Sequence, residues 1–431
     1  MPPTVYIYNS TLGCVRGHPS RGTAELFEHK VADIVKRLRT TRRPERADIF
    51  FHPACLVTAF FQVRSEAIGQ SAQRAAIRAL HAIEASVLLD IKELGFSHMP
   101  HVINALRCRH TQAPRVRPLG DPFYFHEHAF PRLWGASDPG RSPFAMICPE
   151  APAEVHAAAI HIPYCQPPAS APPVHAVRSI SVLFIGSQGR VDWHHAQGGG
   201  WEGTPQRGTW LSALNRTPSS HTVLLHSRDG REFHGSKDLK RGQLRFPNGR
   251  NLHHALLSSA NFTMCPPGDA PDTQRIYSAI SAGSIPLLDS SFQPPPVVPW
   301  DDISAPLRRH RRPDGSPVLT LPDAVTTAAL LRGVRARARA FECDGDNPLM
   351  VRYLARELQR VAARPEGVDP HGVQRVAATV HSGHDGCRRL LHAWSDAEHA
   401  AAATSRASPL LQALSCLHAD RNQTACACAV G

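Results

Sequence analysis

A phosphate-binding combination of residue types occurs within residues 261–289, NFTMCPPGDAPDTQRIYSAISAGSIPLLD. The glycine of its turn allows the backbone to approach a ligand closely, and a threonine and an arginine follow at the start of a predicted helix. A guanidinium pairs phosphate oxygens in fork geometry, and a hydroxyl can donate beside it. A diphosphate is the anion that this combination suits best, while many strand-loop-helix units carry a similar loop for structural reasons alone. The candidate residues are Pro267, Gly268, Asp269, Thr273 and Arg275.

A strand, a helix and a second strand position these residues. The apolar run at 261–265 predicts a buried strand, and Asp272 is a suitable N-cap for the helix that follows. Gly283 is a natural helix end, and the segment 284–289 predicts the next strand. In an open parallel sheet, ligands bind beyond the carboxyl ends of the strands, where the N–H groups of a helix N-terminus face outward. The loop and the first helical turn therefore lie where a ligand would bind.

A second glycine-containing turn, FIGSQGR, follows directly on the predicted strand SISVLFI. Gly186 and Ser187 can approach a phosphate, and Arg190 can offset its charge. The alternative interpretation is a tight turn with an exposed arginine.

The pattern along the whole chain predicts two α/β domains. The first predicted elements are a strand at 5–8, a helix at 24–38, a strand at 47–53, a helix at 65–93 and a strand at 101–106. Strand, helix and strand in succession indicate a parallel sheet with right-handed crossovers. The proline-rich segment 114–173 marks loops and a linker. We therefore predict an N-terminal domain at 1–175, a C-terminal domain at 176–362 and a peripheral extension at 363–431.

The net charge of the 431-residue chain is +12, and all but 5 of its 48 basic residues are arginine. Such an excess favours acidic partners, nucleic acid among them. The densest basic run, RRHRRPDG at 308–315, contains no aromatic residue on which a base could stack. We predict a solvated loop there and no nucleic-acid partner.

The eleven cysteines lack the paired C-x-x-C spacing of a zinc site, and some can form disulfides in an oxidising compartment. No apolar stretch reaches the roughly 20 residues that span a bilayer, and the start of the chain has no recognisable signal peptide. Sequons that would permit glycosylation occur at Asn9, Asn215, Asn261 and Asn422.

The segment LLSSANFTMCPPGDAPDTQRIYSAISAGSIPLLD, followed by PPPVVPWDDIS, resembles the signature of the exostosin family of glycosyltransferases. That signature runs from a strand through Cys-Pro-x-Gly, a Ser/Thr-x-Arg helix start and an Ala-rich helix to Gly-x-Ile-Pro and an apolar segment with tryptophan. Upstream, the segments VYIYN, ADIFFHP, IHIPY and SVLFIGSQGR occur in the family's order. The similarity covers about residues 5–360.

The resemblance implies an α/β fold of GT-B type, in which two Rossmann-like domains with parallel sheets face each other across a cleft. Members of the family transfer a sugar from a UDP-sugar, with inversion, to a polysaccharide or glycan acceptor. The C-terminal domain binds the nucleotide-sugar donor, the N-terminal domain binds the acceptor, and no metal or cofactor is required. The predicted donor-binding residues are Gly186, Ser187, Arg190, Pro267, Gly268, Asp269, Thr273, Arg275 and Ser278.

Two departures from the family pattern bear on activity. The family commonly has Glu or Asp three residues after the arginine, where a carboxylate can hold both ribose hydroxyls, and this chain has Ser278. The family's Gly-Arg-Asp-His segment has its nearest counterpart in RCRHTQ, at 107–112. A general base must take the proton of the acceptor hydroxyl. The predicted catalytic residues are His110 and Glu127, with His126 and His128 as further candidates.

Three hypotheses remain open from the sequence. The first is an active inverting glycosyltransferase. The second, which Ser278 motivates, is a non-catalytic exostosin homologue that binds glycan or serves as the partner subunit of a homo- or hetero-oligomer. The third is a basic polymer-binding module unrelated to transfer. By resemblance, the chain works in the Golgi lumen or at the Golgi membrane.

Overall fold

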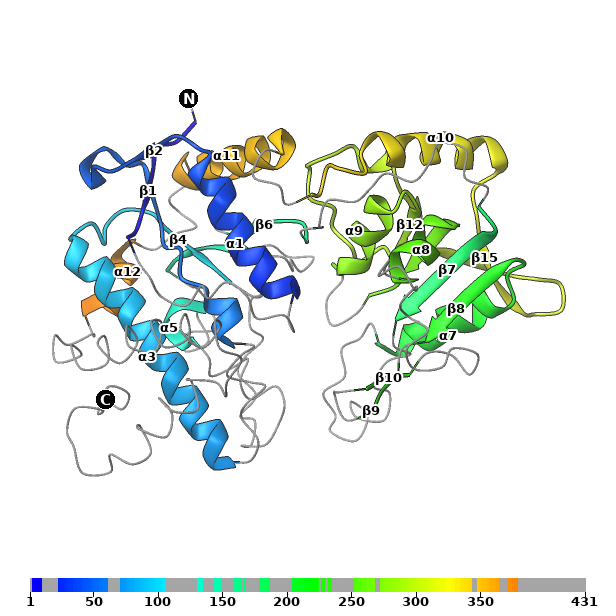
Figure 1. Cartoon of the computed structure of the whole chain (residues 1–431), viewed down its shortest axis with the longest axis horizontal. Helices are drawn as coiled ribbons and strands as arrows, with labels where there is room; N and C mark the ends of the chain where they lie inside the picture. The colour runs from blue at the N-terminus through cyan, green and yellow to red at the C-terminus, as the bar shows by residue number, and fades with distance from the viewer. Residues whose placement is uncertain are drawn as a thin grey trace. The chain divides into compact units, whose positions relative to one another are not determined.

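The structure of the chain is a computed structural model, which describes residues 2–9, 22–60, 70–105, 130–134, 143–148, 159–164, 166, 178–186, 204–224, 226–228, 232–234, 252–267, 272–342, 347–363 and 370–378. It has the predicted mixed α/β architecture and divides into two compact units, each with a parallel sheet (Figure 1). The N-terminal unit comprises residues 1–149, 154–162 and 351–431, and the C-terminal unit comprises residues 150–153 and 163–350. Both sheets are compatible with Rossmann-like folds.

The sheet of the N-terminal unit has six parallel strands in the order β2-β1-β3-β4-β5-β6. Its strands are β1 (Val5–Ile7), β2 (Thr40–Thr41), β3 (Ile49–Phe51), β4 (His101–Asn104), β5 (Ala145–Cys148) and β6 (Ala159–His161). Its helices are α1 (Gly22–Lys36), η1 (Pro44–Arg46), α3 (Gln70–Leu94) and α5 (Pro131–Trp134). Every residue of β3 to β6 is buried, because parallel sheets are covered on both faces. This burial explains the continuous apolar runs that predicted these strands.

The end of the described chain belongs to the N-terminal unit, unlike the predicted peripheral extension. Most of α11 (Pro348–Ala363) and all of α12 (Pro370–Ala378) lie in that unit. The Tyr353 hydroxyl donates to the carbonyl of His161 over 2.6 Å. Val373 of α12 is fully buried in the same core as residues of α3. The division between the units, at residues 162 and 163, also precedes the predicted boundary at about residue 175.

A buried polar pair lies inside the N-terminal sheet. His101 has no exposed surface, its Nε2–H donates to the carbonyl of Phe96 over 3.0 Å, and its Nδ1 lies 3.2 Å from the Tyr8 hydroxyl, which donates to it. Burial, with smaller contributions from the nearby His52 and His98, lowers the pKa of His101 to about 4. The ring is therefore neutral in the folded protein at neutral pH.

Acid should destabilise this unit through His101. A histidine in the unfolded chain binds a proton near pH 6.5, whereas the buried ring does so only near pH 4, so stability is lost as the pH falls between these values. We expect the wild type to lose about 3 kcal/mol of unfolding free energy from pH 7 to pH 4 beyond the loss shown by His101→Gln. Urea unfolding of both proteins across this range measures the difference. Parallel losses in the two proteins would contradict the assignment.

The sheet of the C-terminal unit has five parallel strands in the order β13-β12-β11-β7-β8. Its strands are β7 (Ile180–Gly186), β8 (Ser220–Leu224), β11 (Ala260–Cys265), β12 (Ile285–Leu288) and β13 (Ala305–Pro306). Its helices are α7 (Thr204–Asn215), α8 (Leu252–Ser258), α9 (Gln274–Ser281), η2 (Trp300–Asp302) and α10 (Ala324–Ala336). The core beneath the sheet includes an aromatic group in which Tyr277 contacts Trp300 and Phe341.

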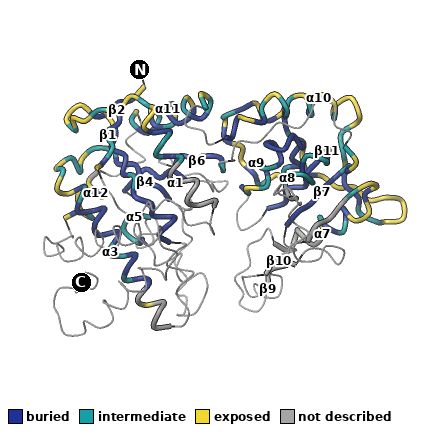
Figure 2. The backbone as a smooth tube through the Cα atoms, viewed as in Figure 1, coloured by how far each residue is buried: buried dark blue, intermediate teal, exposed yellow. Residues whose placement is uncertain are grey.

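Two antiparallel hairpins accompany this sheet. One pairs β9 (His226–Arg228) with β10 (Glu232–His234), and the other pairs β14 (Arg308–Arg311) with β15 (Pro317–Thr320). The basic run at 308–315 therefore begins with a strand, and its prediction as a loop is wrong. Its predicted solvation is confirmed, because every residue of β14 is exposed (Figure 2).

Cys55 and Cys148 take part in disulfides, and Cys265 is a buried free thiol. No helix within the part of the chain that the structure describes is long and apolar enough to cross a membrane.

Candidate functional site

The strand order of the C-terminal sheet creates a topological switch point between β7 and β11. From β7 the chain continues to β8 on one side, and β11 and β12 then follow on the other side. In open parallel sheets, this reversal leaves a crevice beyond the carboxyl ends of the two central strands, where ligands bind. The register pairs Thr263 with Leu183, so Cys265 at the end of β11 lies beside the end of β7. The two predicted ligand-binding turns follow these two strand ends.

Arg275 joins the first turn of α9 to the end of β7. Its Nε–H donates to the carbonyl of Ile185 over 2.8 Å. Its guanidinium carbon lies 4.7 Å from the centroid of the Phe184 ring, which is cation–π distance. A hydrogen bond and a ring contact thus fix one positive charge at the carboxyl edge of the sheet.

Gly186, the last residue of β7, packs directly against this guanidinium. A Cβ at this position would overlap Nη2 of Arg275 and lie 3.3 Å from its Cζ and 3.1 Å from the ring of Phe184. A side chain larger than hydrogen is therefore incompatible with the observed position of Arg275. The two predicted donor-binding residues, 89 positions apart in the chain, are in direct contact.

The start of α9 differs by one residue from the predicted start. Thr273, with extended backbone angles, is the N-cap, and its side chain makes no capping hydrogen bond. Its Oγ1 atom is buried and has no hydrogen-bond partner among the residues that the structure describes. A buried hydroxyl with no partner among the described residues, at a helix N-terminus, fits the predicted role of Thr273 as a donor to a bound anion.

Asp272 was predicted as the N-cap, and this prediction is wrong because its carboxylate turns to another partner. It is 2% exposed and accepts a hydrogen bond from the Tyr277 hydroxyl over 2.9 Å. At the other end of the helix, Gly283 has a φ of +79° and ends it as predicted. The N–H groups of Gly283 and Ser284 bond to the carbonyls of Ile280 and Ala279, which is the Schellman pattern.

The Tyr277–Asp272 bond should stabilise the support of the site. Tyr277→Phe keeps the ring contacts and removes only the hydroxyl, which leaves a buried carboxylate with one donor fewer. We expect the unfolding free energy to fall by about 1.5–3 kcal/mol, as for hydrogen bonds to charged groups. Tyr353→Phe is a matched control, because its hydroxyl donates to a neutral carbonyl and should cost about 1 kcal/mol. Urea unfolding measures both, and a smaller loss for Tyr277→Phe than for the control would contradict this role.

Ser278 is hydrogen-bonded within the protein. Its hydroxyl donates to Oε1 of Gln166 over 2.9 Å. Gln166 is 4% exposed, its backbone N–H donates to Phe341, and its Nε2 donates to the carbonyl of Tyr164. A ligand hydroxyl that reached Ser278 would share it with this fixed amide.

Cys265 completes the edge of the site. Burial raises the pKa of its thiol to about 12, while the charge of Arg275 acts in the opposite direction. The thiol therefore stays protonated at neutral pH, and it donates to the carbonyl of Thr263 over 3.4 Å.

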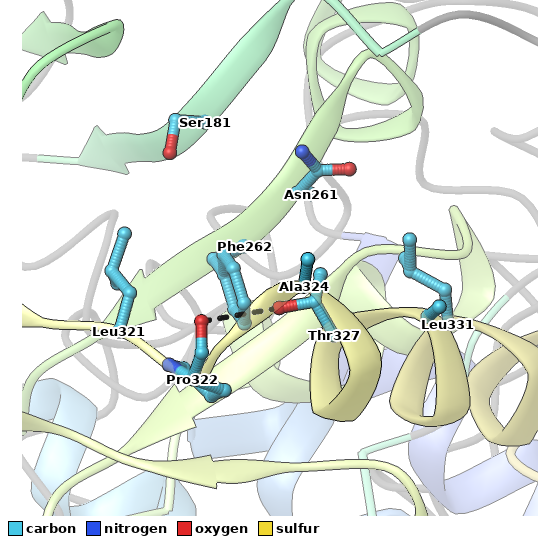
Figure 3. A pocket seen from close by; sticks show the side chains of 9 residues that line it. Ser181, Asn261, Phe262, Leu321, Pro322, Ala324, Thr327 and Leu331 are labelled. Carbon is cyan, nitrogen blue, oxygen red and sulfur yellow. Dashed lines mark hydrogen bonds between the residues drawn. The ribbon is translucent and has the colours of Figure 1, made fainter.

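A hollow of about 410 Å³ lies at the opposite edge of the same sheet (Figure 3). Ser181 and Asn261, the second residues of β7 and β11, line it together with Leu331 of α10. In Figure 3, Thr327 at the start of α10 donates to the carbonyl of Pro322 below the hollow. Because these strand residues stand at the amino ends, the hollow is separate from the edge that holds Arg275.

The remaining predicted residues have different outcomes. Pro267 is buried two residues after β11, in the expected loop. The other predictions lie outside the described residues, namely His110, Glu127, His126, His128, Ser187, Arg190, Gly268 and Asp269. The described part of the chain contains no group of three or more His, Cys, Asp or Glu side chains that could hold a metal ion.

Three contributors to the site were not predicted from the sequence. They are the Ile185 carbonyl, the Phe184 ring and the Gln166 amide. The first two belong to β7, which is apolar along most of its length. Its sequence does not distinguish the residues at the strand end from those in the core. Gln166 lies in a proline-rich segment without periodicity.

No protein-family model and no curated protein matches the chain.

Proposed function

We propose that the chain is an inverting glycosyltransferase of the exostosin type, which moves a sugar from a UDP-sugar to a polysaccharide or glycan acceptor. The observation that carries this proposal is the contact between Arg275 and Gly186 at the switch point of the C-terminal sheet. It places a fixed guanidinium, and the N-terminus of α9, where an open parallel sheet binds its ligand. The resemblance of the same residues to the exostosin signature supports a nucleoside diphosphate as that ligand.

The chemistry of the proposal requires stabilisation of a leaving group. The acceptor oxygen attacks the anomeric carbon, the bond from that carbon to the β-phosphate oxygen breaks, and a base takes the acceptor proton. The diphosphate gains negative charge as it leaves. The Arg275 guanidinium and the α9 N-terminus offset that charge, and Thr273 donates its hydroxyl. His110 and Glu127 stay the candidates for the base.

The remaining parts of the proposal follow from the resemblance. They are the GT-B arrangement, an acceptor site on the N-terminal unit, and work in the Golgi lumen. The disulfides of Cys55 and Cys148 support an oxidising compartment such as that lumen.

Release of UDP from a panel of UDP-sugars, with oligosaccharide acceptors, tests this function. We expect one sugar to support acceptor-dependent UDP release in the wild type and in Arg332→Ala, an exposed control arginine on α10. Arg275→Ala should lack this activity. A wild-type protein that binds no UDP would contradict the proposal.

A second candidate is a non-catalytic homologue that binds nucleotide or glycan and supports a partner subunit. The observation that favours it is the Ser278–Gln166 hydrogen bond, which occupies the position where the family commonly presents a carboxylate. The same assay separates the candidates, because this one predicts UDP binding without turnover of any UDP-sugar.

A further inference from the structure

The β14–β15 hairpin carries a concentration of positive charge. We use the name basic hairpin for the β14–β15 hairpin together with the exposed arginines at this surface, Arg216, Arg308, Arg309, Arg311 and Arg312. In Figure 1 the hairpin includes β15, which lies beside α7. Every residue of β14 is exposed, whereas Val318 and Leu319 of β15 are buried. Arg216 joins it from the end of α7, because Nη2 of Arg312 donates to its carbonyl over 3.3 Å.

Within the described part of the chain, ion pairs do not neutralise this charge. None of the five arginines forms an ion pair with any residue that the structure describes. Asp314, in the hairpin turn, is the nearby carboxylate, and its pKa is lowered mainly by hydrogen bonds from Ser316 and then by the charges of Arg312 and Arg216. Asp314 therefore offsets part of the charge of Arg312 and Arg216.

Contacts within the protein hold several of these side chains in place. The guanidinium of Arg309 lies 5.2 Å from the centroid of the Trp210 ring, and Nη1 of Arg311 donates to the carbonyl of Gly315 over 2.9 Å. The hairpin itself is anchored to α7 by the Leu319 N–H, which donates to the Thr217 hydroxyl. A ligand would thus meet donors that have already lost part of their conformational entropy.

The surroundings of the charge restrict the class of partner. Arg309 lies over a face of the Trp210 ring, so a nucleic-acid base that stacked on that face would have to displace the arginine. Across the described residues, Val325 of α10 is the exposed large apolar side chain, so the hairpin has no apolar residues to insert into a membrane. Guanidinium groups bind carboxylates and sulfates in bidentate fashion without stacking or insertion.

We propose that the basic hairpin binds an anionic polysaccharide, one that carries carboxylate or sulfate groups along its chain. This inference does not depend on the donor site at Arg275. The polymer binds through repeated ion pairs and bidentate hydrogen bonds, so its affinity falls steeply with salt.

Affinity for heparin, a sulfated probe, and for polygalacturonate, a carboxylated probe, tests the proposal. The hairpin variant is Arg308→Gln, Arg311→Gln and Arg312→Gln. A matched control removes the same charge from an exposed arginine group next to Glu45, by Arg42→Gln, Arg43→Gln and Arg46→Gln. We expect the hairpin variant to bind at least one probe about tenfold more weakly at 0.1 M NaCl, with a salt slope smaller by about two. The control triple variant and Arg275→Ala should bind as the wild type does.

Each other outcome overturns the inference. Equal weakening in the hairpin and control variants would mean that net charge alone binds the polymer. Loss of binding in Arg275→Ala would move the polymer to the other site. Tighter binding to a 20-base-pair DNA duplex, or to phosphatidylserine vesicles, would replace the polysaccharide by another partner. Thermal unfolding of the triple variants, together with the single variant Arg308→Gln, separates loss of binding from loss of fold.

Discussion

Arg275→Ala should lower the affinity of the protein for UDP by at least about 100-fold, which is about 3 kcal/mol. Removing one partner of a buried, hydrogen-bonded charge pair with a phosphate costs 2–5 kcal/mol or more. The guanidinium is already fixed by Ile185 and Phe184, so it loses little entropy on binding and its whole charge acts on the ligand. Calorimetric titration with UDP measures the change.

Two controls make this result specific. Arg332→Ala removes an equal charge from an exposed position of the same unit, and its UDP affinity should stay within about twofold of the wild type. Titration with uridine, which lacks the diphosphate, should give weak binding that is the same in the wild type and in Arg275→Ala. An unchanged UDP affinity in Arg275→Ala would remove the site assignment.

Gly186→Ala should weaken UDP binding by about tenfold or more without unfolding the protein. The new methyl group overlaps Nη2 of Arg275, which is the free end of a flexible side chain, so the arginine moves and the strand does not. The hydrogen bond to Ile185 and the contact with Phe184 are then lost, and the guanidinium leaves the strand end. We expect the unfolding free energy to change by about 1 kcal/mol or less.

A double-mutant cycle distinguishes this mechanism from direct interference with the ligand. If the methyl group acts by displacing Arg275, it has nothing to displace once the arginine is gone. Gly186→Ala should therefore add little to the effect of Arg275→Ala, as measured by ligand-observed NMR at millimolar UDP. Additive losses in the double variant would show that Gly186 and Arg275 act separately.

The sequence predicted the local elements of the site well, because each is specified by residues close to it. Local sequence patterns predict both strands and the end of the helix: apolar runs predict β7 and β11, and a glycine marks the end of α9. All three features lie where they were expected. The position of Arg275 in the first helical turn follows from the same local pattern.

Contacts between residues that are distant in the sequence could not be predicted from local patterns. The N-cap prediction failed because Tyr277, five residues later, takes the Asp272 carboxylate. Nothing in the sequence links Gln166 to Ser278, 112 positions away, since the bond depends on tertiary structure. Val373 likewise looks isolated in a segment poor in apolar residues, and its burial depends on a contact with a core built some 300 residues earlier.

The contacts of the basic hairpin could not be predicted from the sequence either. The arginine run is plain in the sequence, but its antiparallel pairing with β15 and its contact with Trp210 are not. Those contacts turn a charged segment into an ordered surface, and they are what supports an anionic polymer as its partner.

Amide hydrogen exchange with and without UDP tests the central claim most directly, because it locates the nucleotide without any substitution. A diphosphate held by Arg275 and the α9 N-terminus should slow exchange in the peptide that covers 272–281. Exchange in the hairpin, 308–320, and in the α10 wall of the opposite hollow, 324–331, should not change. Unchanged exchange at 272–281 with saturating UDP, or protection at 324–331 in its place, would contradict the proposed donor site.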